Sequence, residues 1–134
     1  KRTTLYNLAL FKKQIKKKFY FLDEYADSSL IKIKNYTKVL KINCTTLDKI
    51  LKNLKSKVKL IKIDAEGAEP EVLLGLKKEY PKVKYISIEA GNERGIKQLS
   101  TFKKCKKILK KINFNLIYSN YTQKTYLFEN QNFK

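Results

Sequence analysis

Carboxylates gather in one stretch of a chain in which lysine is by far the commonest charged residue. Of the 12 acidic side chains in 134 residues, more than half fall between positions 64 and 93. Like charges repel, so a sequence with only structural demands tends to disperse them. Lys62 lies two positions before Asp64, and on a strand that spacing puts both side chains on the same face. A carboxylate held beside a lysine in this way can accept the proton of a reacting hydroxyl group.

The acidic residues of this stretch do not all favour a functional role. Asp64 and Glu66 belong to a tight turn that directly follows a predicted strand, and we interpret them as site residues. Glu69 fits a site and the first turn of a helix equally well. The remaining acids are interpreted as partners of the helix dipole or as surface residues: Glu71, Glu79 and Glu93.

The composition excludes several kinds of site. The chain has no His, which excludes imidazole base catalysis, Ser-His-Asp and Cys-His nucleophile systems and His-ligated metal sites. Cys44 and Cys105 lie far apart and form no C-x-x-C pair, so we expect no metal site and no disulfide framework. The longest clean apolar run falls far short of the roughly 18 residues that cross a bilayer. We therefore expect a soluble, cytoplasmic protein with no signal peptide and no transmembrane segment.

Hydrophobic periodicity predicts the elements that hold the site residues. Residues 58–64 predict a strand that is buried on both faces near its end, and residues 83–89 predict a second strand. Asp64 and Glu89 then mark the carboxyl ends of two strands, and in open α/β sheets ligands bind just beyond those ends. Gly67 marks a tight turn between the first of these strands and a helix.

Further elements complete the pattern. Apolar residues at i, i+3, i+4 and i+7 predict a helix with a buried face from Leu47 to Leu54, and a longer amphipathic helix is predicted from Leu99 to Ile112. Residues 12–18 are expected in a loop. Other strands are predicted at 5–10, 19–22, 39–44, 114–119 and 125–129. Helices that alternate with buried strands, followed by a terminal hairpin, predict an α/β fold with one mixed sheet, parallel except at one edge.

The positive charge of the chain is interpreted as solvated surface. The formal net charge is +19, and all 31 basic residues except Arg2 and Arg94 are lysines. Proteins that read bases favour the bidentate guanidinium group, so we do not expect a nucleic-acid partner. Two alternatives stay open. One is a non-enzymatic basic module that binds nucleic acid through its lysines. The other is a helix at 103–111 that lies on an anionic membrane surface, although packing of its apolar side on the sheet is favoured.

Several motifs form a recognisable set when taken together. A K-I-D-A-E-G-A-E block occupies positions 62–69, with T-L-D at 46–48 upstream and I-S-I-E at 86–89 downstream. N-L-A-L stands at 7–10 and S-S-L at 28–30. This set resembles the FkbM family of S-adenosylmethionine-dependent methyltransferases, in which the last two motifs are similar to the third strand and to a Ser-Ser-Leu element. The resemblance covers nearly the whole chain.

The resemblance implies a Rossmann-like methyltransferase fold that uses S-adenosylmethionine as its cofactor. The reaction it implies is methylation of a hydroxyl oxygen on a sugar, polyketide or related metabolite, so the expected partner is a small-molecule or glycan acceptor. Lys62 is expected to orient Asp64, and a plain turn is an equally good interpretation of Ser28 and Ser29. The expected catalytic residues are Asp64, Glu66 and Lys62. The expected substrate-binding residues are Glu69, Glu89, Ser28 and Ser29. The expected cofactor-binding residues are Ala9 and Leu10.

The chain contains no Met and begins at Lys1, so we expect it to be part of a longer protein. The family's glycine-rich first turn, which approaches the cofactor, and the acidic residue that holds the ribose would precede Lys1. We therefore expect residues 1–134 to be the C-terminal portion of one methyltransferase domain, unable to bind the cofactor alone. Phe11 departs from the family, which has a small residue there. A degenerate methyltransferase fold that serves as a partner-binding surface is a third alternative, and the acceptor and oligomeric state are not predicted.

Overall fold

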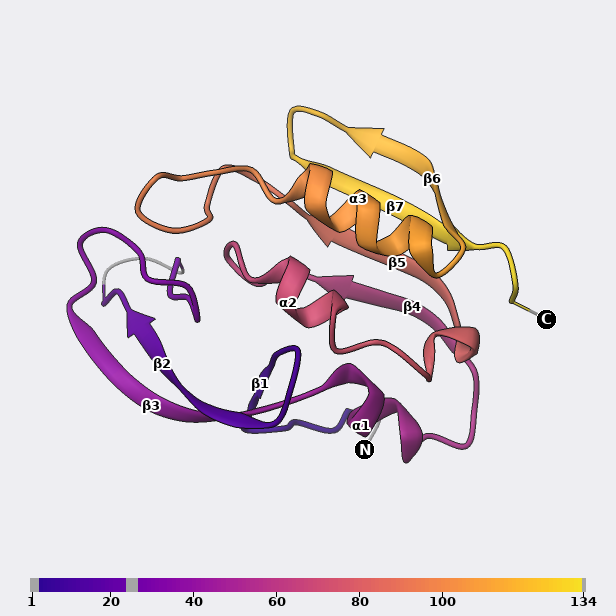
Figure 1. Cartoon of the computed structure of the whole chain (residues 1–134), viewed down its shortest axis with the longest axis horizontal. Coiled ribbons are helices and arrows are strands. Elements are labelled where there is room, and N and C mark those ends of the chain that lie inside the picture. The colour runs from indigo at the N-terminus through magenta and orange to yellow at the C-terminus, as the bar shows by residue number, and fades with distance from the viewer. Residues whose placement is uncertain (1–2, 24–26, 134) are drawn as a thin grey trace.

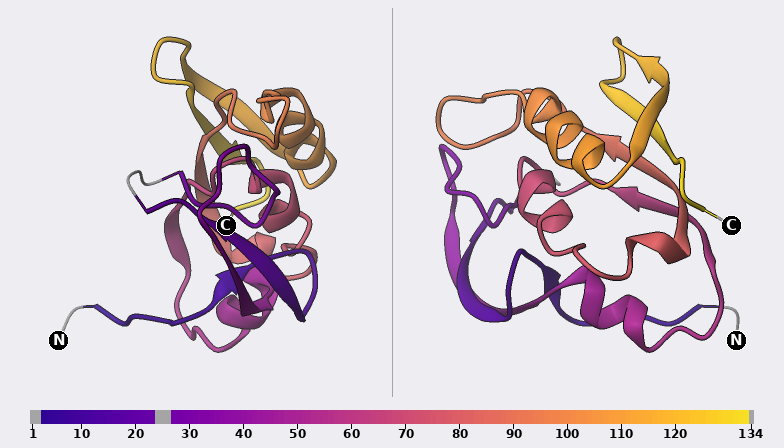
Figure 2. Two further views of the ribbon diagram at one scale, coloured as in Figure 1. Left: turned by 90° about the vertical axis from the view of Figure 1, so that its left-hand side faces the viewer. Right: turned by 45° about the vertical axis from the view of Figure 1, so that its right-hand side comes forward.

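Two β-sheets lie side by side in the structure, and a short helix, α2 (Glu69–Leu73), lies between them (Figures 1 and 2). The computed structural model describes residues 3–23 and 27–133. The N-terminal part of the chain forms the first sheet and the remainder forms the second. Ala68, directly before α2, is buried together with Phe11, Leu30 and Cys44 of the first sheet region. The start of α2 therefore connects the two halves of the core.

The first sheet contains β1 (Ala9–Leu10), β2 (Ile15–Phe21) and β3 (Lys38–Thr45) in the order β1-β3-β2. The predicted strand at 5–10 is wrong for most of its length, because only two residues pair with β3 and Leu5 is 91% exposed. The predicted loop at 12–18 is also wrong beyond Gln14. The lysines there are part of β2, which pairs antiparallel with β3 over its whole length.

The second sheet contains β4 (Val58–Ile63), β5 (Val83–Glu89), β6 (Phe114–Asn120) and β7 (Thr125–Asn130) in the order β4-β5-β7-β6. The β4–β5 pair is parallel and the other pairs are antiparallel, which confirms the α/β fold and the terminal hairpin. The expectation of one sheet is wrong. Both sides of β3 are already occupied by β1 and β2, so this strand has no free side to pair with β4.

The longer helices follow the predicted apolar faces, with differences at their ends. Helix α1 (Leu47–Lys52) buries Leu47 and Leu51, and Thr46 caps it by accepting a hydrogen bond from the Lys49 amide at 3.2 Å. Leu54 lies beyond the end of this helix and is 38% exposed, so the predicted apolar face is shorter than expected. A 3₁₀ turn, η1 (Tyr80–Lys82), precedes β5.

Helix α3 (Phe102–Lys111) covers one face of the second sheet together with α2 (Figure 1). Cys105 and Leu109 of α3 are fully buried in the same core cluster as Ile86 and Phe128 of the sheet. Leu99, which the sequence places in this helix, instead lies in a loop and forms an isolated β-bridge with Arg94. No helix in the described residues is long and apolar enough to cross a membrane.

The edges of the second sheet differ in regularity. Strand β4 forms one edge, and near its end Ile63 is buried but the Lys62 side chain is 60% exposed, so the prediction of burial on both faces near the end is wrong for this strand. Strand β6 forms the other edge and its register with β7 shifts between Leu116 and Tyr118. Such a β-bulge bends a strand and increases its twist.

Asp48 makes a long-range connection that the sequence does not reveal. Its carboxylate accepts hydrogen bonds from the backbone amides of Lys77, Lys78 and Glu79 at 3.0–3.2 Å. The sequence predicts only a favourable position of this acid near the N-terminus of α1. In the structure it also satisfies three successive amides of the segment that follows α2, and so fixes α1 against that segment.

Candidate active site

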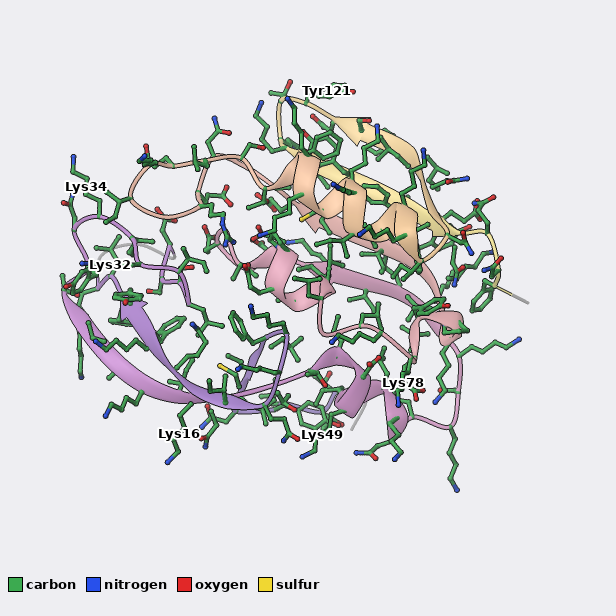
Figure 3. All side chains as sticks on the ribbon, in the orientation of Figure 1. Lys16, Lys32, Lys34, Lys49, Lys78 and Tyr121 are labelled. Atoms are coloured by element: carbon green, nitrogen blue, oxygen red, sulfur yellow. The ribbon has the colours of Figure 1, made fainter. Side chains whose placement is uncertain are left out.

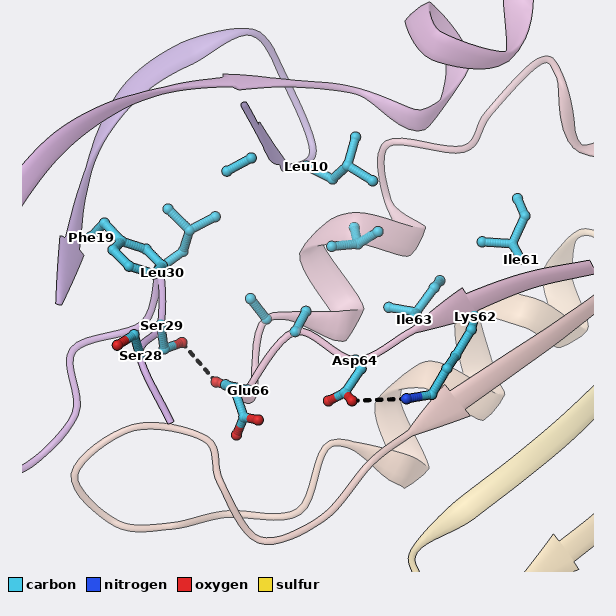
Figure 4. Close-up of a pocket in the computed structure, with 14 residues that line it drawn as sticks. Leu10, Phe19, Ser28, Ser29, Leu30, Ile61, Lys62, Ile63, Asp64 and Glu66 are labelled. Atoms are coloured by element: carbon cyan, nitrogen blue, oxygen red, sulfur yellow. Dashed lines mark hydrogen bonds and ion pairs between the residues drawn. The ribbon is translucent and has the colours of Figure 1, made fainter. Parts of the chain in front are cut away.

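A pocket of about 500 Å³ opens where the carboxyl end of β4 faces the first sheet (Figure 4). Most of its wall is apolar and comes from both sheets and α2: Ala9, Leu10, Phe19, Leu30, Ile61, Ile63, Ala65, Ala68 and Val72. Its polar residues are Ser28, Ser29, Lys62, Asp64 and Glu66. An apolar cavity with a few convergent polar groups is the usual form of a small-molecule site.

Lys62 links the carboxylates at the ends of two neighbouring strands. Its Nζ lies 3.0 Å from Oδ2 of Asp64, which directly follows β4, and 3.8 Å from Oε2 of Glu89, the last residue of β5. Hydrogen bonding to Asp64 raises the pKa of Lys62, so the ammonium stays charged. The three side chains are 38–60% exposed, which leaves the Asp64 carboxylate open to a ligand in the pocket.

The turn that follows Asp64 is organised by a buried carboxylate. Oε1 of Glu69 accepts hydrogen bonds from the amides of Ala65 at 3.1 Å and Gly67 at 2.9 Å, and its Oε2 accepts one from the Thr101 hydroxyl at 2.8 Å. Glu69 is fully buried. Because both carboxylate oxygens of Glu69 accept hydrogen bonds from donors within the chain, Glu69 stabilises the conformation of the turn.

Arg94 fastens a second loop onto the same turn. Its guanidinium donates to the carbonyl of Gly67 at 2.6 Å and to both carboxylate oxygens of Glu71 at 2.7 and 2.8 Å. Gly67 has a φ of +86°, and a Cβ built there would lie 2.6 Å from Cα of Arg94. Only glycine therefore fits both the backbone conformation and the close approach of the loop.

Ser29 connects the first sheet to the turn, and Ser28 binds the segment that follows β2. The Ser29 hydroxyl donates to the carbonyl of Glu66 at 2.7 Å and accepts from the Ile31 amide at 3.1 Å, while the Ser28 hydroxyl accepts from the Leu22 amide. Figure 4 shows Ser29 reaching across to Glu66 from the opposite side of the pocket. These hydrogen bonds stabilise the pocket wall.

The Glu66 carboxyl lies in a partly buried, negatively charged environment. Desolvation, followed by the charges of Glu93, Asp64, Asp27 and Glu69, raises the pKa of Glu66 to about 7. Desolvation and nearby carboxylates also raise the pKa of Glu93. Glu66 therefore changes its charge near neutral pH, which is the range in which a group that both accepts and donates protons works best.

The structure brings most of the predicted site residues together. All of them line the pocket except Glu69, which lies beneath the turn, and Glu89, which is connected to the pocket through Lys62. Arg94 and Thr101 were not predicted, although both bind the turn through their side chains. One signal was available for Arg94, because it is one of two arginines in a chain rich in lysine. For Thr101 the sequence offers none.

Comparison with known proteins identifies the family. A family model described as the methyltransferase FkbM domain matches residues 6–127. The chain belongs to the FkbM methyltransferase family. No curated protein and no solved structure matches the chain. The family match spans the elements of both sheets as far as β7, including every residue of the pocket, and membership indicates methyltransferase activity.

Methyltransferases of this family typically use S-adenosylmethionine, and the pocket of this FkbM chain is compatible with part of that molecule. Ala9 and Leu10 contribute apolar surface to this pocket, and Asp64 and Glu66 contribute acidic side chains that could face a cationic group. Cys44 and Cys105 are both buried, and burial raises the pKa of each thiol, that of Cys105 to about 12. Neither thiol is therefore a reactive nucleophile at neutral pH.

Proposed function

We propose that this chain provides the acceptor-binding side of the active site of an S-adenosylmethionine-dependent methyltransferase that methylates a hydroxyl oxygen. The observation that carries the proposal is the position of Lys62, Asp64 and Glu66. These residues belong to a chain of the FkbM methyltransferase family and line an apolar pocket at the carboxyl end of β4. Sugars, polyketides and related metabolites carry hydroxyl groups of the required kind.

The cofactor supplies an electrophilic methyl group, and the chain supplies position and proton transfer. Holding the acceptor oxygen in line with the methyl group accounts for much of the rate in such a displacement. The methyl group would pass to the acceptor oxygen with cleavage of its C–S bond and release of the neutral thioether, and the proton of the hydroxyl would pass to the carboxylate of Asp64 or Glu66, which can contribute about 10²–10⁴-fold. Lys62 holds Asp64 in place at 3.0 Å.

The two candidate bases predict different pH profiles. If Glu66 accepts the proton, the rate should rise as its carboxyl ionises around pH 7, since the pKa of Glu66 is raised to about 7. If Asp64 accepts the proton, replacing Glu66 with Gln should remove any such rise without abolishing turnover. Turnover of the Glu66→Gln variant at pH 8 therefore separates the two, because it should be largely lost if Glu66 is the base and retained if Asp64 is the base.

We assign the remaining predicted residues supporting roles. Glu89 is placed to bind an acceptor hydroxyl beside Lys62, and Glu69 acts as a positioning residue through its hydrogen bonds to the turn. We further propose that Ala9 and Leu10 contact the cofactor. In this proposal the β4-β5-β7-β6 sheet is the C-terminal half of a Rossmann-like sheet, and residues 1–134 are a portion of that domain.

The test is methyl transfer from methyl-labelled S-adenosylmethionine to a panel of sugars and polyketides, measured with the chain at its full natural length. Asp64→Asn should lower turnover by about 10²–10⁴-fold if Asp64 is the base, and Glu66→Gln should do so if Glu66 is the base, while the circular dichroism spectrum of each variant stays unchanged. Asp23→Asn, the same chemical change at an exposed position outside the pocket, should leave turnover within twofold of the parent. Full turnover in both Asp64→Asn and Glu66→Gln would disprove the assignment. Cofactor binding without transfer to any acceptor would instead favour the degenerate-fold alternative.

A further inference from the structure

A second hollow lies on the side of β2 that faces away from β3. Segment 30–32 runs beside β2, held by the paired backbone hydrogen bonds of Tyr20 and Ser29 at 2.8 and 3.0 Å. Between strand and segment is an open groove of about 450 Å³. We call it the lysine groove, and it is lined by Ile15, Lys16, Lys17, Lys18, Tyr20, Leu30, Ile31 and Lys32.

The lysine groove is positively charged and has no acidic residue in its lining. Across the sheet Lys18 lies directly opposite Lys41, a pairing of like charges that destabilises a β-sheet. Within the described part of the chain, no ion pair involves Lys16, Lys18 or Lys41. Figure 3 shows Lys16 at the margin of the molecule. Among the described residues, the arrangement therefore gathers positive charge that no carboxylate pairs with at Lys16, Lys18 and Lys41.

The groove and the candidate active site share a wall. Leu30 lines both, and on β2 Phe19 lines the pocket while its neighbours Lys18 and Tyr20 line the groove. One molecule that reaches over Leu30 could therefore place a hydroxyl near Asp64 and an anionic group among the lysines. Ammonium groups bind phosphate as point charges, with three donors each.

We propose that the lysine groove binds the phosphate of a phosphorylated acceptor, such as a sugar phosphate, whose hydroxyl lies in the pocket. The identity of this ligand as the acceptor rests on the proposed function, whereas phosphate binding in the groove does not. The two can therefore fail separately. If the chain binds phosphate in the groove but transfers no methyl group, the proposed function is overturned. If it transfers methyl groups but does not bind phosphate in the groove, only this inference is overturned.

The experiment compares two triple variants by calorimetry at low ionic strength, with pyrophosphate, glucose 1-phosphate and glucose as probes. Lys16→Gln/Lys18→Gln/Lys32→Gln removes three charges from the groove. Lys103→Gln/Lys107→Gln/Lys110→Gln removes the same charge from the exposed face of α3. We expect the groove variant to lose about tenfold or more in affinity for pyrophosphate, because it loses three charged donors. The α3 variant should change by less than twofold, and glucose should bind more weakly than glucose 1-phosphate.

Backbone amide shifts of the unmodified chain give a second measurement that needs no variant. Glucose 1-phosphate should shift the amides at 15–20 and 30–32 and leave those of α3 unchanged. Equal loss of affinity in the two variants, or shifts spread over all lysine-rich surfaces, would show only a diffuse attraction by the net charge and overturn the proposal. A single-stranded oligonucleotide that occupies the same residues far more tightly than the sugar phosphate would also overturn it, in favour of nucleic acid.

Discussion

Glu66 combines three unusual features at one residue. Its backbone has a positive φ of 47°, its carbonyl accepts the Ser29 hydroxyl, and its carboxyl is surrounded by other acids. A non-glycine residue in this conformation is uncommon and is usually held there by its surroundings. Here the Ser29 hydrogen bond and the Glu69-bound turn hold the backbone, and the partly buried carboxyl group of Glu66 lies within the electrostatic reach of Glu93, Asp64 and Asp27.

The raised pKa of Glu66 predicts a specific pH dependence of stability. Because folding raises the pKa from 4.5 to about 7, the protonated form is favoured in the folded state, and the resulting stability is present below pH 4.5 and lost as the pH rises through 7. Glu66→Gln should therefore raise the free energy of unfolding at pH 8, by about 1 kcal/mol or less because solvent screens this group. At pH 4.5 it should have little effect.

Thermal unfolding between pH 4.5 and 8 measures this difference, with Asp23→Asn as the matched control. A gain in stability that is equal at both ends of the range would contradict the pKa argument. It would then have to come from better local packing of the amide.

At the scale of elements, the turn at 64–69 depends on a loop that the sequence does not connect to it. Arg94 reaches from the β5–α3 loop to the Gly67 carbonyl and to Glu71, whose side chain is only 10% exposed. Lys104 is the other cation near Glu71, at 3.8 Å, and is 54% exposed. The geometry of the arginine fork therefore supplies most of the compensation for this buried carboxylate.

Arg94→Lys should lower the free energy of unfolding by about 1–3 kcal/mol, since an ammonium cannot reproduce the bidentate pair and the third bond to Gly67. Lys104→Gln, which removes the exposed cation, should change stability by less than about 0.5 kcal/mol. Urea unfolding gives both values. Hydrogen exchange of the Ala65 and Gly67 amides should quicken in the arginine variant. Unchanged exchange there would show that the loop does not stabilise the turn.

The helices and strands with a strong hydrophobic pattern could be predicted from the sequence, and those with a weak pattern could not. Strands β5, β6 and β7 have strong apolar patterns and were predicted within about one residue, as was the turn at Gly67. The prediction of a loop at 15–18 was wrong because three consecutive lysines give no apolar strand pattern, whereas the pairing of this segment with β3 is fixed by backbone hydrogen bonds. The pocket residues from β4 could be found from the carboxylates at the strand end. Phe19 and the Arg94 contacts could not, because only the folded chain brings these distant segments together.

At the scale of the molecule, the net charge of +19 acts against the compact state. Lysines occupy both sheets and α3, and ion pairs in the described residues involve few of them. Folding therefore brings many like charges closer together than they are in the extended chain.

Raising the NaCl concentration from about 20 mM to about 300 mM should raise the melting temperature by a few degrees, because screening weakens this repulsion. The α3 triple variant, which carries three fewer positive charges, should show a smaller rise. Differential scanning calorimetry measures both. A melting temperature that falls with added salt would indicate that attractive ion pairs outweigh the repulsion.

The two edge strands of the second sheet differ in how well they could pair with a further strand. A bulge disturbs β6, whereas β4 keeps an uninterrupted register with β5 and offers a straight row of backbone donors and acceptors on its outer side. Its six residues correspond to about 20 Å of strand. The exposed Lys59 on this strand disfavours pairing with a second copy of the same edge. The β4 edge therefore disfavours pairing with a second copy of itself, and its backbone donors and acceptors could instead pair with a strand of different sequence.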